Sequence, residues 1–127
     1  MREHCAPDEK IVLWVGSSKR DLLRFPEKVI DEVGTALSAA QFGGMHPAAK
    51  PWKGEGPGMF EIVEDHDRAT YRAVYTVQFA KAIYVLHCFQ KKSPRGIKTA
   101  RPDIDLICSR LKDARSDYEA RYGNDKT

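Results

Sequence analysis

The first half of the chain changes from a β-type apolar run to a helical period. Residues 11–15 (IVLWV) are apolar throughout and predict a strand that ends at Gly16-Ser17-Ser18, where either serine can cap a helix. From residue 19 to 42, apolar residues recur every three or four positions. Because Pro26 suits the first turn of a new helix, the pattern predicts two helices, over residues 18–24 and 26–42.

The second half alternates with the period of strands until a last helical stretch. Residues 43–58 contain five glycines and three prolines and predict a loop. Strands are expected over residues 59–64, 70–79 and 83–89, with a turn at residues 65–68 and a helix from Pro102-Asp103 onward. The run 83–89 is apolar on both faces and is expected at the centre of the sheet.

The element order β-α-α-β-β-β-α predicts one α+β domain over residues 1–127, with flexible ends at 1–9 and 119–127. We expect a small, mostly antiparallel sheet of about four strands, an N-terminal helical pair on one face, and a C-terminal helix. The first strand lies either at an edge or beside a strand distant in sequence.

Composition places this domain in a reducing compartment. With 42% hydrophobic residues the chain can build a core, and no apolar run approaches the roughly 18–20 residues that cross a bilayer. The charged residues 1–10 do not resemble a signal peptide. Cys5, Cys88 and Cys108 form no CxxC pair, so we predict a cytoplasmic protein without a metal site or a cofactor, and with Cys88 and Cys108 in the core.

Positive charge gathers in the C-terminal third. Residues 1–89 hold 11 Lys or Arg against 12 Asp or Glu, whereas residues 90–127 hold 10 against 6. Five of these cations fall within residues 91–101, where there is no acid. Such a segment fits a polyanionic partner, and it equally fits a solvated basic loop, so charge alone leaves both interpretations open.

A longer pattern carries a family resemblance. Its parts are Gly16-Ser17-Ser18, Phe25-Pro26, Lys50-Pro51, Gly56-Pro57-Gly58, Tyr71-Arg72 with Tyr75, Tyr84-Val85-Leu86-His87, Phe89-Gln90-Lys91-Lys92-Ser93, Gly96-Ile97-Lys98-Thr99, Asp103-Ile104-Asp105-Leu106 and Arg110-Leu111. Over residues 11–113 the chain resembles the phage-related HigB-like branch of the RelE/ParE toxin superfamily.

The resemblance implies a RelE-like fold and the toxin of a type II toxin–antitoxin system, a ribosome-dependent endonuclease that cuts mRNA. Its implied partners are the ribosome, mRNA and a cognate antitoxin, often of helix-turn-helix type, with no membrane. Two alternatives stay open: a gyrase inhibitor like the ParE relatives, and a non-catalytic phage-derived binding module.

Metal-free RNA cleavage needs a base for the 2′-hydroxyl, cations for the phosphorane and an acid for the leaving oxygen. Four residues are the expected catalytic set: Arg72, His87, Lys91 and Lys92. Arg72 could instead pair with Glu61 on a neighbouring strand. His87 shares the alternation phase of Ile83, Val85 and Phe89, which favours a core histidine over a base or acid.

RNA-backbone contacts are expected around the same strand end. The predicted RNA-binding residues are Lys50, Lys53, Gln90, Ser93, Arg95, Lys98 and Thr99. Trp52, between two lysines, suits stacking on a base, and a buried tryptophan is the alternative. Thr99 could equally cap the last helix.

Overall fold

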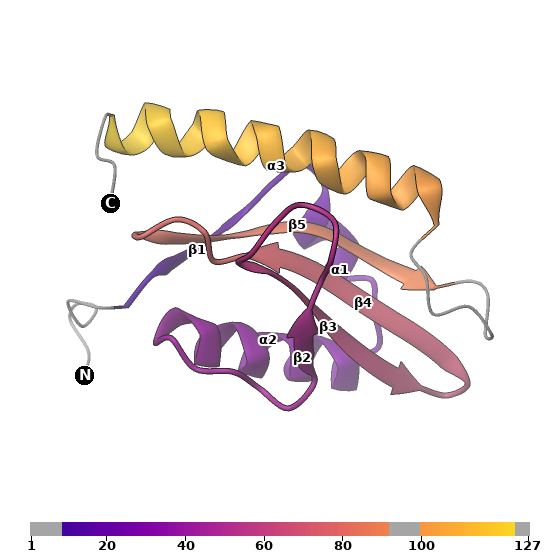
Figure 1. Cartoon of the computed structure of the whole chain (residues 1–127). Helices are drawn as coiled ribbons and strands as arrows, with labels where there is room; N and C mark the ends of the chain where they lie inside the picture. The colour runs from indigo at the N-terminus through magenta and orange to yellow at the C-terminus, as the bar shows by residue number, and fades with distance from the viewer. Residues whose placement is uncertain (1–8, 92–99, 124–127) are drawn as a thin grey trace.

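Five strands form one sheet in a computed structural model that describes residues 9–91 and 100–123 (Figure 1). In spatial order they are β1 (Ile11–Trp14), β5 (Ala82–Lys91), β4 (Ala69–Thr76), β3 (Met59–His66) and β2 (Ala49–Pro51). Three helices complete the described chain: α1 (Ser18–Leu22), α2 (Glu27–Gln41) and α3 (Arg101–Tyr122).

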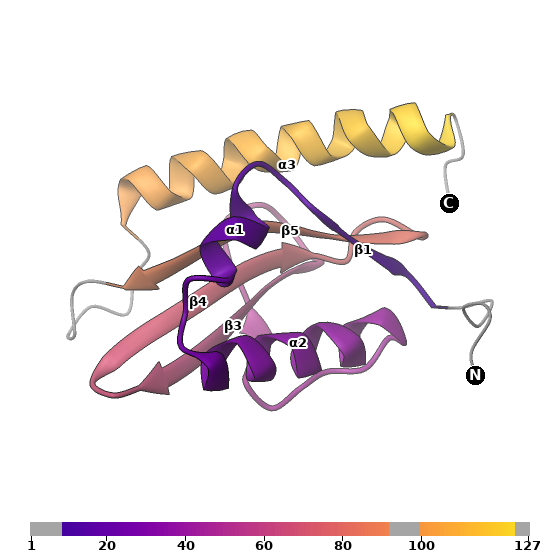
Figure 2. The same ribbon diagram turned by 180° about the vertical axis from the view of Figure 1, so that it is seen from behind.

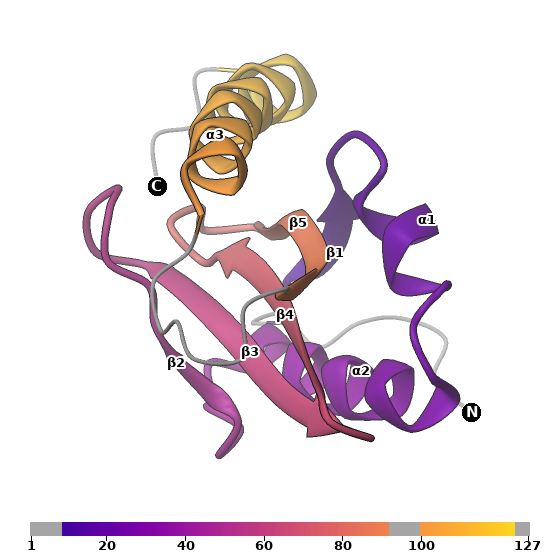
Figure 3. The ribbon, with the colours of Figure 1, turned by 90° about the vertical axis from the view of Figure 1, so that its right-hand side faces the viewer.

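The helices cover the two faces of the sheet separately. Figure 3 shows α3 above the sheet and α2 below it, with α1 beside the β1 edge on the α2 side. Figure 2 shows α1 from behind, next to β5, where the buried Ser18 hydroxyl donates to the Val85 carbonyl over 3.0 Å. The predicted α+β architecture, with a helical pair on one face and a C-terminal helix, is confirmed.

β1 lies at one edge and pairs in parallel with β5, whereas every other pairing is antiparallel. The sheet is therefore mostly antiparallel, as predicted, and the open question about the first strand is answered. β2 is an addition, because it falls inside the expected loop 43–58 and makes five strands instead of four.

The β3–β4 hairpin turns on Asp67 and Arg68, whose φ values are +52° and +70°. Two central residues with positive φ make the tight turn that matches the twist of paired strands. Asp65 and His66, expected within the turn, belong instead to β3 and pair with Thr70 and Ala69.

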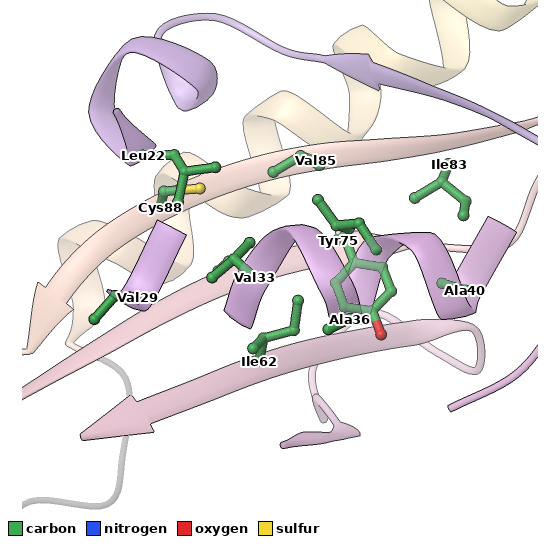
Figure 4. Packing of buried hydrophobic residues seen from close by; sticks show 12 residues of the cluster. Leu22, Val29, Val33, Ala36, Ala40, Ile62, Tyr75, Ile83, Val85 and Cys88 are labelled. Atoms are coloured by element: carbon green, nitrogen blue, oxygen red, sulfur yellow. The ribbon is translucent and has the colours of Figure 1, made fainter. Parts of the chain in front are cut away.

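Each face of the sheet has its own apolar core. Figure 4 shows the cluster on the α2 side, where Val29, Val33 and Ala36 pack against Ile62 and Tyr75. The cluster on the α3 side is built by Ile107, Leu111 and Ala114 against strand residues that include Met59, Val74, Tyr84 and Leu86.

An irregularity in β5 changes which face its last residues occupy. Tyr75 pairs with Val85 and Val74 pairs with His87, so Leu86 is an extra residue without a partner on β4. Such a β-bulge reverses the alternation beyond it. Ile83, Val85 and Cys88 therefore join the α2-side core, whereas His87 lies on the α3 side. The prediction that His87 shares a face with Ile83 and Val85 was wrong.

Two smaller expectations need correction. Cys88 is buried as predicted, but Cys108 is only half-buried, and its thiol lies 3.0 Å from a Glu55 carboxylate oxygen. Residues 119–122, expected in a flexible end, belong to α3, which continues to Tyr122, whose ring packs on Tyr118 with centroids 4.7 Å apart. The parts 1–8 and 124–127 of the predicted flexible ends lie outside the described residues. No helix in the described ranges is long and apolar enough to span a membrane.

Candidate active site

Five charged or titratable residues gather on the α3 face of the sheet, where β5 ends and α3 begins. The register places Glu61 on β3, Arg72 on β4, and His87 and Lys91 on β5, all on this face; Asp103 joins them from the first turn of α3. Figure 1 shows the end of β5 close to the N-terminal end of α3. We call these five residues the charged cluster.

Arg72 and Glu61 form a buried ion pair across β4 and β3. Arg72 Nη1 donates to Glu61 Oε1 over 2.7 Å, and the two residues are 8% and 9% exposed. The pairing that sequence reasoning left open as an alternative is therefore present. Arg72 Nε is buried and has no hydrogen-bond partner among residues 9–91 and 100–123, so within this part of the chain the guanidinium keeps one donor unsatisfied.

His87 is held on two sides. Its Nε2 lies 2.8 Å from Asp103 Oδ1, and its ring stacks on Phe89 with centroids 4.5 Å apart and an interplanar angle of 17°. The residue is only 7% exposed, and its Nδ1 is buried without a hydrogen-bond partner in the described part of the chain. The cluster thus contains two buried nitrogen atoms, Arg72 Nε and His87 Nδ1, that no described residue satisfies.

Lys91 stands at the end of β5, opposite Thr70 and on the face of Arg72. Burial, and then repulsion from the Arg72 guanidinium, lower the pKa of Lys91 below its ordinary value of 10.5, while Glu61 and Asp103 oppose the shift. A lysine with a lowered pKa releases its proton more readily, which suits an acid as well as a phosphate contact.

Lys50 lies on the same face as the charged cluster. It pairs with Glu61 in the β2–β3 register, and its side chain is exposed. Lys53 is exposed beyond the end of β2. Trp52, between them, is 6% exposed within the α3-side core, so the buried alternative applies and base stacking does not.

The structure does not bring Gln90 to this site. Gln90 pairs with Tyr71, and both side chains lie on the α2 face, which follows from the alternation after the bulge. The other predicted site residues lie outside the described residues: Lys92, Ser93, Arg95, Lys98 and Thr99.

Two residues that sequence reasoning did not single out complete the arrangement. Asp103 was named only at the helix start and within the family pattern, although an acid in the first turn beside a basic strand end was an available signal. Arg110 lies further along α3, and its Nη1 donates to the carbonyl of the bulge residue Leu86 over 2.9 Å. No group of three metal-ligating side chains is found among residues 9–91 and 100–123.

Comparison with known proteins identifies the family of this chain. A family model described as phage-derived protein Gp49-like (DUF891) matches residues 20–112, well over half of the chain. Among solved structures, the chain is similar to a chain of the toxin–antitoxin complex RelBE2 from Mycobacterium tuberculosis. That similarity has 19% identity and a TM-score of 0.44, and it covers 65% of this chain and 99% of that one. No curated protein matches.

Proposed function

The chain belongs to the phage-derived Gp49-like family, and from that premise we propose that it is the toxin of a type II toxin–antitoxin system, cutting mRNA on the ribosome. The observation that carries the proposal is the position of Arg72, His87 and Lys91 on one face, at one end of the sheet. The basic residues of segment 91–101 begin at the same strand end. This arrangement suits a phosphodiester held beside a proton acceptor.

In the proposed reaction His87 takes the proton of the 2′-hydroxyl, and the 2′-oxygen forms a bond to the adjacent phosphorus. The bond from phosphorus to the 5′-oxygen breaks, and Lys91 gives its proton to that oxygen. The products are a 2′,3′-cyclic phosphate and a 5′-hydroxyl. Arg72 and Lys92 neutralise the charge that grows on the phosphoryl oxygens, which needs no metal ion.

Two of the proposed catalytic side chains already bind carboxylates of the protein, so they must keep free donor or acceptor atoms for the substrate. Glu61 already holds Arg72, and Asp103 holds His87. Arginine has five donors, so the bond from Nη1 to Glu61 leaves others for a phosphate. The ion pair therefore orients Arg72 without consuming it.

The direct test is a translation extract programmed with a defined message. We expect the wild-type protein to cut the message within codons and to leave cyclic phosphate ends. Lys91→Ala should reduce cleavage at least tenfold, since it removes both a charge and the proton donor. Lys112→Ala, which removes an exposed lysine of α3 outside the charged cluster, is the charge-matched control. An uncut message with the wild-type protein would refute the function; equal activity of the two variants would refute the role of Lys91.

A toxin of this kind needs a neutralising partner. We infer a cognate antitoxin, of helix-turn-helix type in the related systems, encoded beside the toxin. Growth should stop when the chain is expressed alone and resume when the neighbouring reading frame is co-expressed. Growth that continues at full expression of soluble toxin would count against the toxin assignment.

A further inference from the structure

Within the charged cluster, the contact between His87 and Asp103 constrains which nitrogen of a neutral imidazole carries the proton. Asp103 Oδ1 lies 2.8 Å from Nε2 of His87. An ionised carboxylate only accepts hydrogen bonds, so a neutral His87 must have its proton on Nε2 to make this contact. Nδ1 is then the unprotonated nitrogen, with its lone pair available.

The surroundings of the ring keep it in this orientation. Phe89 stacks on one face of the imidazole, and the residue is more than nine-tenths buried. Asp103 is the third residue of α3 after its N-cap residue Ala100, a position from which an acid commonly bonds back to the helix start. Its side chain here bonds to His87 instead, and it is 31% exposed.

The two unsatisfied atoms of the cluster have complementary hydrogen-bonding roles. Arg72 Nε offers a hydrogen-bond donor, and His87 Nδ1 in this tautomer offers an acceptor; both are buried, and neither has a partner among the residues that the structure describes. Arg72 and His87 are diagonal neighbours on adjacent strands, since Arg72 pairs with Phe89 and Val74 pairs with His87. A hydroxyl group can accept from the first atom and donate to the second.

We propose that Asp103 is a positioning residue: it fixes His87 as the Nε2-protonated tautomer and so makes Nδ1 the atom that receives the proton of an attacking ribose hydroxyl. The part that concerns the reaction rests on the proposed function, whereas the tautomer rests on the geometry alone. Asp103 acts through His87 and does not touch the substrate.

The test of the tautomer is nitrogen NMR of the full chain with the imidazole of His87 neutral. In the wild type we expect a protonated Nε2 and an unprotonated Nδ1. Asp103→Ala removes the acceptor, so both tautomers should be populated. Asp103→Asn retains a carbonyl oxygen that can accept the same bond and should restore the wild-type tautomer. A protonated Nδ1 in the wild type, or an unchanged tautomer in Asp103→Ala, would overturn the proposal.

Cleavage measurements supply the second readout. Asp103→Ala should lower the turnover rate by roughly 10–100-fold, the usual effect of losing a partner that orients a functional imidazole, with little change in KM. The matched control is Asp105→Ala, which removes an exposed acid of the first turns of α3. This variant should behave like the wild type. If the wild-type protein does not cut RNA, the proposed function fails, and the NMR result still decides the tautomer.

Discussion

The two faces of the sheet bury similar strands under helices, yet among the described residues the buried charged side chains lie on one face only. On the α2 face the buried cluster is apolar, from Leu22 and Val29 to Ala40 (Figure 4). On the α3 face an apolar core of the same kind gives way, toward the end of β5, to Glu61, Arg72 and His87. One face therefore serves stability, whereas under the proposed function the other is divided between stability and chemistry.

The difference has an energetic meaning. Ion pairs in an interior are seldom more stabilising than apolar residues of the same size, because the lost hydration offsets the attraction between the charges. Arg72 and Glu61, at 8% and 9% exposed, have lost most of their hydration, and Arg72 Nε has no hydrogen-bond partner among the described residues. A fold that needed only stability would place apolar residues here, as the α2 face does.

The α2 face gives the largest expected effect, and that effect is on stability alone. Leu37 is 4% exposed within the apolar cluster. Leu37→Ala should lower the free energy of unfolding by about 2–5 kcal/mol, through lost burial and the cavity left behind. Urea unfolding measures the change, and message cleavage per folded molecule should equal that of the wild type. A reduced rate per folded molecule would mean that the α2 face also takes part in the chemistry.

Replacing the ion pair on the α3 face is expected to lower the cleavage rate and to leave the stability unchanged or higher. Arg72→Met combined with Glu61→Met replaces both charges by apolar side chains, so neither charge is left buried alone. The double variant should unfold at the same urea concentration as the wild type or a higher one. Its cleavage rate should fall by about 10²–10³-fold, because a cation that stabilises the transition state has been removed.

A purely structural ion pair would give a different outcome for this variant. Cleavage would then stay near the wild-type rate while the fold stayed intact. The single variant Arg72→Met is less informative, since it leaves Glu61 buried without a partner and is expected to destabilise the fold by about 3–5 kcal/mol.

The same comparison explains what could be predicted from the sequence. The α2 face follows from local patterns: a helical period over Val29, Val33, Ala36 and Leu37, and alternation through Ala73 and Tyr75. Each pattern repeats every few residues, so it can be recognised without knowledge of the rest of the fold. β2 has no such pattern, since three residues, Ala49–Pro51, become a strand only through their pairing with β3.

The charged cluster depends on features that periodicity does not report. The run 82–88 is buried at every residue, so nothing in its composition marks Leu86 as the extra residue of a bulge. Reading the alternation without the bulge placed His87 on the wrong face. The Arg72–Glu61 pair could be anticipated because a hairpin joins its strands, whereas the His87–Asp103 contact joins β5 to a helix beyond segment 92–99.

The bulge itself is supported from α3. The carbonyl of Leu86 accepts a hydrogen bond from Arg110 Nη1 over 2.9 Å, and Arg110 Nη2 donates to the Ser17 hydroxyl over 3.1 Å. The guanidinium passes over Gly16, where an added Cβ would lie 2.8 Å from Arg110 Nε. Gly16 also has φ of +57°, a conformation that favours glycine. The glycine thus leaves room for the arginine that holds the bulge.

The smallest expected effect comes from closing that space. Gly16→Ala should cost about 1–2 kcal/mol of folding free energy for the positive φ, and it should displace the Arg110 side chain from Leu86. The bulge then loses the hydrogen bond from Arg110, but its own residues are unchanged. We therefore expect cleavage per folded molecule to fall only a few-fold. Urea unfolding and the translation extract measure the two effects on the same preparation.

Gly34→Ala is the matched control for this substitution. Gly34 lies within α2 on the other face of the sheet, and nothing lies within 4 Å of an added Cβ. Alanine there should stabilise the protein by about 0.5–1 kcal/mol, since glycine is the poorer helix former, and should leave the cleavage rate unchanged. If Gly16→Ala destabilised the fold without slowing cleavage per folded molecule, the bulge would support the fold alone, and the orientation of His87 would rest on Asp103 and Phe89.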